Sequence, residues 1–140
     1  MLKIKKLFLT LILTLTLLSP AFALEKPATQ PIFTSNKKPL LISQKQPTFT
    51  ITLQSNPTTG FSWQLKSYSK NLINFIGHQY YPPKNKKLLG APGYETWTFE
   101  AKKADYAVNQ VGHIRLDYAR PWTKNGTTGM NFIVIVKAKH

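Results

Sequence analysis

Short segments in which apolar and polar residues strictly alternate are the feature that most limits how this chain can fold. In one of them, Phe49, Ile51 and Leu53 fall on one face, and threonines fall on the other. The same alternation recurs in four later segments, which are 61–66, 94–102, 111–118 and 131–139. A period of two is the pattern of a half-buried β-strand, and no segment after the first 23 residues has a helical period.

Two further segments complete a set of strands separated by Gly, Pro and Asn turns. Residues 72–81 are apolar and aromatic, and Pro31-Ile32-Phe33 suits a short edge strand because Pro is tolerated there. The final strand is strongly apolar at Phe132–Val136, so we expect it to be central and paired on both edges. The sequence therefore predicts an all-β, immunoglobulin-like β-sandwich of about seven or eight strands.

The first 23 residues have the layout of a secretory signal peptide. Three lysines precede an apolar run, Leu7–Leu18, and Ala21-Phe22-Ala23 follows as a cleavage pattern. The run is too short for a membrane anchor, which needs about 20 apolar residues. We therefore expect cleavage after Ala23, and a mature chain that is exported, either periplasmic or secreted, with no membrane contact.

Residues 24–140 then form a single domain, in which 24–30 is predicted to be a loose N-terminal arm rich in Pro, Lys and Thr. The chain has no Cys, so its stability must come from core packing. The absence of Cys also excludes thiol catalysis and thiolate metal sites. The sequence leaves the oligomeric state open, and we expect a monomer.

The chain is strongly basic, with 19 Lys and Arg against 5 Asp and Glu. Such a surface favours acidic partners. Only Arg115 and Arg120 are arginines, however, whereas proteins that read nucleic acid usually rely on Arg for bidentate contacts. We therefore expect no nucleic-acid partner.

Candidate catalytic residues are few. His78, His113 and His140 lack metal-ligand spacing, so we predict isolated surface or boundary histidines, no metal and no cofactor. Composition alone leaves open a Ser62–His113–Asp117 site, but no G-x-S-x-G motif supports it. Glu100 and Asp117 are predicted to face away from the core, which disfavours a pair of catalytic carboxylates. A hydrolase with an unrecognised site is the weakest reading.

Three unusual loops remain. The first, Asn56-Pro57-Thr58-Thr59-Gly60 before Phe61, is stiff because Pro fixes φ and both threonines are β-branched. We expect Gly60 to adopt a positive φ. The second loop is Leu88-Leu89-Gly90-Ala91-Pro92-Gly93, whose leucines either fold back on the core or form an apolar contact surface.

The third loop contains Arg120-Pro121-Trp122, residue types enriched at binding hot spots. Alternatively, Trp122 caps the end of the sandwich with Arg120 stacked on it. A near copy of the first turn follows at Asn125–Gly129, and it is predicted only to return the chain to the last strand. In an immunoglobulin-like sandwich the three loops gather at one end, which is typical of a binding edge rather than a catalytic cleft.

The three loop motifs occur in an order that resembles the chagasin family of cysteine-peptidase inhibitors. The resemblance extends over 48–136, and it includes Trp63 as well as the motifs at 56–61, 90–93 and 120–122. One departure is Pro92, which stands where the family's G-x-G-G motif has its third position. Pro removes a backbone N–H, which bears on selectivity among peptidases.

The resemblance implies an immunoglobulin-like sandwich that is not an enzyme. It implies reversible, tight inhibition of papain-like cysteine peptidases by the three loops. The implied contact residues are Asn56, Pro57, Thr58, Thr59, Gly60, Phe61, Leu88, Leu89, Gly90, Ala91, Pro92, Gly93, Arg120, Pro121 and Trp122. The residues alone leave an alternative open, an exported basic β-sandwich module that binds polyanions or cell-wall glycans.

Overall fold

The structure is a computed structural model that describes residues 29–85, 87–88, 90–123 and 128–139. The predicted signal peptide, 1–23, and most of the predicted arm lie outside these residues. The described part is all-β, with one short 3-10 helix, η1 (Pro57–Thr59). No helix in it is long and apolar enough to cross a membrane.

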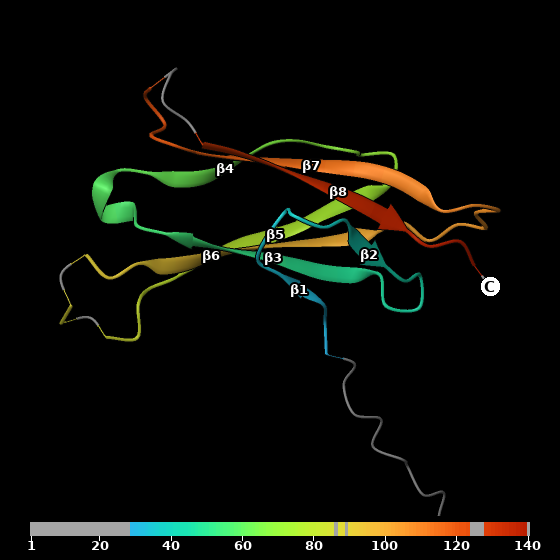
Figure 1. The fold of residues 1–140 in the computed structure, drawn as a ribbon, viewed down its shortest axis with the longest axis horizontal. Coiled ribbons are helices and arrows are strands. Elements are labelled where there is room, and N and C mark those ends of the chain that lie inside the picture. Colours follow the sequence, from blue (N-terminus) through green and yellow to red (C-terminus); the bar gives the residue numbers. More distant parts are fainter. Residues whose placement is uncertain (1–28, 86, 89, 124–127, 140) are drawn as a thin grey trace, which may run out of the picture.

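Eight strands form two four-stranded sheets that pack face to face (Figure 1). In spatial order, the first sheet contains β1 (Ile32–Phe33), β3 (Thr48–Ser55), β6 (Gly93–Ala101) and β5 (Ile73–Tyr81). The second sheet contains, also in spatial order, β2 (Leu40–Ile42), β8 (Thr128–Val136), β7 (Gln110–Ala119) and β4 (Ser62–Tyr68). The prediction of an all-β sandwich is therefore confirmed.

The core lies between the sheets and is built from the residues that the alternation placed on one face. Phe49, Ile51 and Leu53 of β3 are buried, as are Phe99 of β6 and Phe132 of β8. The rings of Phe49 and Phe99 stack with 5.7 Å between their centroids. Period-two sequence patterns thus identified the inward faces correctly, because successive side chains of a strand point to opposite faces.

The apolar last strand is central, as predicted. β8 pairs with β7 on one side and with β2 on the other, and Val134 is opposite both Gly112 and Leu40. β1 is an edge strand that pairs parallel to β3, also as predicted. β2 was not predicted, because three residues are too few to show an alternation.

Some strand ends differ from the prediction. β4 begins at Ser62, which leaves Phe61 in the preceding loop, and β6 begins at Gly93. β8 ends at Val136, so residues 137–139 continue beyond it. There the backbone N–H of Lys137 donates to the Ile42 carbonyl oxygen (2.9 Å), and that of Ala138 donates to Asn109 Oδ1 (2.9 Å).

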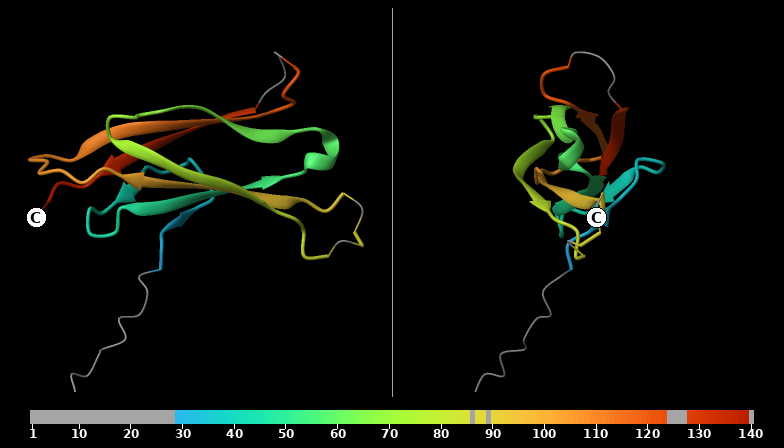
Figure 2. Two further views of the ribbon diagram at one scale, coloured as in Figure 1. Left: turned by 180° about the vertical axis from the view of Figure 1, so that it is seen from behind. Right: turned by 90° about the vertical axis from the view of Figure 1, so that its left-hand side faces the viewer.

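The connections between strands gather at two ends of the sandwich (Figures 1 and 2). The first loop joins β3 to β4, the second joins β5 to β6 and the third joins β7 to β8, and all three lie at what we call the loop end. The opposite end carries the turn from β2 to β3, the turn from β4 to β5, the connection from β6 to β7, and residues 137–139. The expected gathering of the three loops is therefore present.

Candidate functional site

The first loop is a single turn of 3-10 helix that its own polar groups hold closed. The backbone N–H and the hydroxyl of Thr59 both donate to the Asn56 carbonyl oxygen, at 3.1 and 2.7 Å. The Thr58 hydroxyl donates to Asn56 Oδ1 (2.6 Å). Gly60 ends the turn with φ of 79°, as its position after a Pro-initiated turn predicted. Thr58 and Thr59 are exposed at the tip.

Tyr118 and Arg120 fasten the first loop to the start of the third loop. The backbone N–H of Asn56 donates to the Tyr118 hydroxyl oxygen (2.9 Å), and the Tyr118 ring stacks on Phe61 with 5.4 Å between centroids. Arg120 donates from Nε to the Thr59 carbonyl oxygen (3.3 Å). Its guanidinium carbon lies 4.7 Å from the centroid of the Phe61 ring, a cation–π geometry. The two loops are therefore braced against each other.

The buried carboxylate of Glu95 accepts hydrogen bonds from the strand residues on both sides of the first loop. Glu95 is 2% exposed, and its Oε1 accepts hydrogen bonds from the hydroxyl of Ser55 and from the backbone N–H of Trp63 (3.1 Å). Ser55 is the last residue of β3, and Trp63 is the second residue of β4. His78 Nε2 lies 2.7 Å from the other oxygen, Oε2. Glu95 thus connects both sheets at the point where the loop leaves them, and its buried oxygens are all paired.

The second loop is open and carries exposed apolar surface. Leu88 is 62% exposed, so it does not fold back on the core, whereas Leu89 lies outside the described residues. A turn forms where the backbone N–H of Ala91 donates to the Leu88 carbonyl oxygen (3.2 Å). Asn56 Nδ2 donates to the Gly90 carbonyl oxygen (3.4 Å), which links this loop to the first.

Pro92 and Gly93 mark the end of the second loop. Pro92 is half-buried, whereas Gly93 is buried and is the first residue of β6. A Cβ on Gly93 would lie 2.3 Å from the Tyr81 carbonyl oxygen and 2.6 Å from the Tyr80 hydroxyl oxygen. Gly93 was predicted to belong to the loop but is the first residue of β6, and its lack of a side chain admits the close packing of β5.

The third loop presents Trp122 above the first loop. Trp122 is 72% exposed, and Pro121 beside it is exposed as well. The edge of the indole ring approaches Gly60, where an added Cβ would lie 3.0 Å from Trp122 Cη2. Arg120 does not stack on Trp122, as one alternative expected, because Arg120 lies over Phe61 instead. The near-copy turn falls at 125–129, and its first three residues lie outside the described residues.

The candidate catalytic residues do not form a site. Ser62 is opposite Ala119 and His113 is opposite Ile133, so six positions of β7 separate them, or about 20 Å. His113 is exposed and hydrogen-bonds Ser69, with 3.0 Å between Nδ1 and Oγ. Among the residues that the structure describes, no group of His, Cys, Asp or Glu could hold a metal ion.

Of the expectations for polar residues, the one for His78 needs correction and the one for Asp117 holds. His78 is not isolated, because it contacts Glu95 and stacks on Trp97 with 4.0 Å between ring centroids. Asp117 lies on the outer face, as predicted, and is nevertheless buried, at 9% exposure. Arg115 Nε lies 3.0 Å from its Oδ1, and Gly129 on the next strand leaves the room for this pair.

Sequence reasoning missed the residues that support the loops, Glu95 and Tyr118 above all. A signal for Glu95 existed: the inward-facing positions of β6 run from Gly93 through Glu95 to Trp97, so an acid interrupts a buried face. A carboxylate on an inward face must find hydrogen-bond donors there. For Tyr118, the inward position was predicted, but its hydroxyl contact with the first loop had no signal in the sequence.

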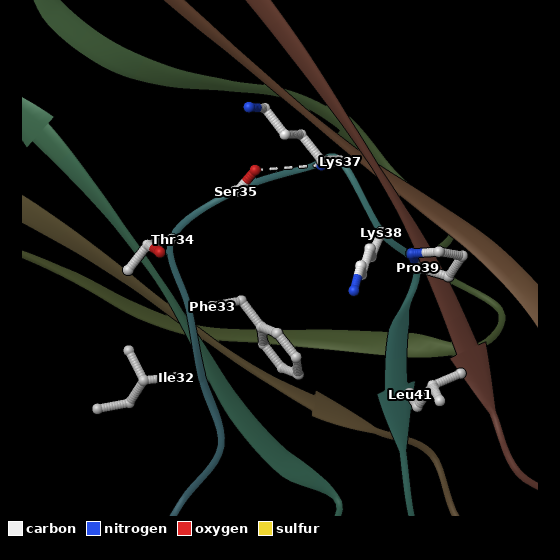
Figure 3. A pocket seen from close by; sticks show the side chains of 8 residues that line it. All are labelled: Ile32, Phe33, Thr34, Ser35, Lys37, Lys38, Pro39 and Leu41. Atoms are coloured by element: carbon white, nitrogen blue, oxygen red, sulfur yellow. Dashed lines mark hydrogen bonds between the residues drawn. The ribbon is translucent and has the colours of Figure 1, made fainter.

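A hollow between the edge strands β1 and β2 lies apart from the loop end (Figure 3). Its apolar lining includes Ile32, Phe33 and Leu41, and the connection between the strands closes it. In this connection the backbone N–H of Lys37 donates to Ser35 Oγ (3.2 Å). None of the loop residues described above lines this hollow, so it is not part of the candidate site.

Solved structures of other proteins share this fold. A cysteine protease inhibitor from Entamoeba histolytica superposes with a TM-score of 0.52 at 17% identity, covering 80% of this chain and 99% of that chain. Amebosin superposes with a TM-score of 0.57 at 22% identity, covering 80% of this chain and 100% of that chain. At these identities the likeness concerns the fold alone.

Comparison of sequences gives the family. Chagasin of Trypanosoma cruzi is 40% identical over 93 residues, which cover 63% of this chain and 78% of that protein. The model of the family described as "Chagasin family peptidase inhibitor I42" matches residues 43–136. This match includes all three loops and six of the eight strands, β3 to β8. The chain therefore belongs to the chagasin family, whose members are peptidase inhibitors and not enzymes.

Proposed function

We propose that this chain is a reversible, tight-binding inhibitor of papain-like cysteine peptidases, whose active-site cleft it occludes with the three loops. The observation that carries the proposal is the interlocked loop end. Three connections from different strand pairs converge there, are tied together through Asn56 and Arg120, and expose Thr58, Leu88 and Trp122. Membership of a peptidase-inhibitor family supports the same function.

The first loop is the element that enters the cleft. Its tip, Thr58 and Thr59, would lie over the catalytic Cys–His pair of the enzyme. Because Pro57–Thr59 is a 3-10 turn, the tip does not offer an extended peptide bond to the nucleophile. Cleavage requires close alignment of the reacting atoms, which a closed turn does not provide. The loop therefore blocks the cleft without being cut.

The flanking loops supply the remaining contact surface. The second loop, with exposed Leu88, would line the non-primed side, and Arg120 and Trp122 would pack on the primed side. The internal hydrogen bonds of the loops mean that little conformational entropy is lost on docking. Lys84, Lys87 and Arg120 are exposed at this end, so association with an acidic peptidase should be fast and should slow as salt increases.

The test is a titration of the protein against papain and against a cathepsin L-type peptidase. We expect inhibition at one inhibitor per active site, recovery of activity after dilution, and an uncut inhibitor chain on a denaturing gel. Trypsin serves as the control, since its serine nucleophile lies in a cleft of different shape. No inhibition of either cysteine peptidase at micromolar concentration would contradict the proposal.

We also propose that the chain acts as an exported monomer with an immunoglobulin-like strand connectivity. The basic start, apolar run and Ala21-Phe22-Ala23 pattern support export, with cleavage after Ala23. N-terminal sequencing of the protein recovered from the producing cells should begin at Leu24. An intact Met1 on the recovered protein would contradict export by this route.

A further inference from the structure

The opposite end of the sandwich gathers lysines from three separate segments. Lys45 lies in the turn from β2 to β3, Lys103 follows β6, and Lys137 and Lys139 follow β8, and all four are exposed. Two neighbouring hollows share Lys45 and Lys139 in their linings. The linings contain one acid, Asp105, whose carboxylate lies 3.0 Å from Lys139 Nζ. The hollows are therefore positively charged.

Gln44 holds these segments together. Its Nε2 donates to the Lys137 carbonyl oxygen (3.0 Å), and its Oε1 accepts from the backbone N–H of Ala104 (3.1 Å). One side chain thus connects the β2–β3 turn to residues 137–139 and to the β6–β7 connection. Because Gln44 also lines both hollows, the lysines surround a fixed backbone frame.

We propose that these two hollows bind an anionic polysaccharide, and that the loop end stays free to bind a peptidase at the same time. The ligand class follows from the side chains present. Lysine ammonium groups are point charges that pair with sulfate, phosphate or carboxylate in many orientations. A polysaccharide is also thin enough to enter a concave surface, which a flat bilayer cannot follow.

Nucleic acid fits this end less well than a polysaccharide. Both arginines of the chain lie on or next to β7 and towards the loop end, so none is available here for bidentate phosphate contacts. Tyr106, the aromatic residue of the β6–β7 connection, packs against the core and donates its hydroxyl to the Lys102 carbonyl oxygen (3.3 Å). It therefore offers no open face on which a base could stack.

The experiment measures binding of a size-defined heparin oligosaccharide by calorimetry. The test variant combines Lys45→Gln, Lys103→Gln and Lys137→Gln. A matched control removes the same charge elsewhere with Lys37→Gln, Lys38→Gln and Lys66→Gln. Each exposed ion pair contributes little, so three together should weaken binding about tenfold in the test variant and less than about twofold in the control. Circular dichroism confirms that both variants fold.

Several outcomes would overturn the proposal. Equal weakening in both variants would show attraction to the overall charge instead of a site. Absence of heparin binding, or binding only to vesicles of anionic phospholipid or to single-stranded DNA, would also overturn it. The part of the proposal that concerns simultaneous binding rests on the proposed inhibition, and is tested separately with papain.

For that test, papain is titrated with and without saturating heparin oligosaccharide, using a small neutral substrate. We expect the same inhibition in both cases, because the two ends of the sandwich do not overlap. Competition between heparin and papain would overturn simultaneous binding. Failure to inhibit papain with or without heparin would contradict the proposed function, and leave the polysaccharide site to be judged on the calorimetry.

Discussion

At the loop end, buried and aromatic side chains connect one loop to another, whereas at the opposite end long charged side chains extend from short turns. Glu95, Tyr118 and Arg120 make the contacts at the loop end. At the opposite end Gln44 joins the backbone segments, and the lysine side chains reach solvent. At the loop end, side-chain contacts thus fix the loops that would contact a partner. At the opposite end they fix only the backbone segments from which the lysine side chains extend.

This difference corresponds to two kinds of recognition. A surface whose loops are already fixed loses little entropy on docking and suits a partner of defined shape, such as an enzyme cleft. Exposed lysines adapt to charges at varying positions and suit a partner of variable structure, at the cost of affinity and with strong screening by salt. Substitutions that are equivalent in chemistry should therefore have unequal effects at the two ends.

The largest difference is expected for the acids. Glu95→Leu should lower the free energy of unfolding by about 3 kcal/mol, since Ser55 Oγ and the Trp63 N–H would lose their buried acceptor. Asp105 at the opposite end is 89% exposed, so Asp105→Leu should change the free energy of unfolding by less than about 0.5 kcal/mol. Urea unfolding of the two variants measures both values. Similar losses would show that Glu95 does not act as a clamp.

Trp122 offers the next largest effect, and on inhibition instead of stability. Trp122→Ala should weaken inhibition of papain by about 2 kcal/mol, roughly 30-fold in the inhibition constant, as for an anchor residue. The fold should remain intact because the side chain is 72% exposed. Val108→Ala is the control at the opposite end, since Val108 is 67% exposed and should not affect inhibition. Unfolding of Trp122→Ala would show a structural cap.

Substitution of two glycines that share one backbone conformation distinguishes the effect of backbone strain from the effect of contact with Trp122. Gly60 has φ of 79° and Gly90 has φ of 78°, so alanine at either position should cost about 1 kcal/mol in stability. A Cβ at Gly60 also meets Trp122 Cη2 at 3.0 Å, whereas a Cβ at Gly90 meets nothing within 4 Å. We therefore expect Gly60→Ala to weaken inhibition further than Gly90→Ala. Thermal unfolding and papain titration of both variants measure the two effects, and equal inhibition would show that the Trp122 contact is unimportant.

The sequence predicted the strands well, but it predicted poorly the hydrogen bonds and ring contacts that hold the loops. The reason is physical. Alternation reports which face of a strand is buried, so Phe49, Phe99 and Phe132 were assigned correctly. β2 gave too short a pattern. Hydrogen bonds such as those of Glu95 depend on which strands become neighbours at the loop end, and this information is not contained in any single segment.

For the loops, too, the sequence predicted the local backbone but not the contacts between loops. Pro57 and Gly60 predicted a stiff turn with a positive φ, because these two residues restrict the backbone locally. The turn's partners were not predictable from the residues alone. Arg120 was expected on Trp122 as one alternative, but the stacking of Phe61 on Tyr118 places a different ring beneath the guanidinium.

The smallest effect is expected when the planar shape of the Arg120 guanidinium is lost but its positive charge is kept. Arg120→Lys retains a cation but loses the planar group over Phe61 and the Nε hydrogen bond to the Thr59 carbonyl oxygen. We expect inhibition to weaken by about 0.7 kcal/mol, roughly threefold. The matched control is Arg115→Lys, because Arg115 contacts Asp117 of β7 and Asn131 of β8 and not the first loop.

Rates of association and dissociation with papain, measured at two salt concentrations, distinguish the two roles that Arg120 could have. If Arg120 braces the first loop, Arg120→Lys should raise the dissociation rate and leave the association rate and its salt dependence unchanged, because the charge that steers encounter is still present. A slower association with unchanged dissociation would instead assign Arg120 to steering alone. The loop end would then owe its stiffness to Tyr118 and Glu95, both of which hold the first loop without using an exposed charge.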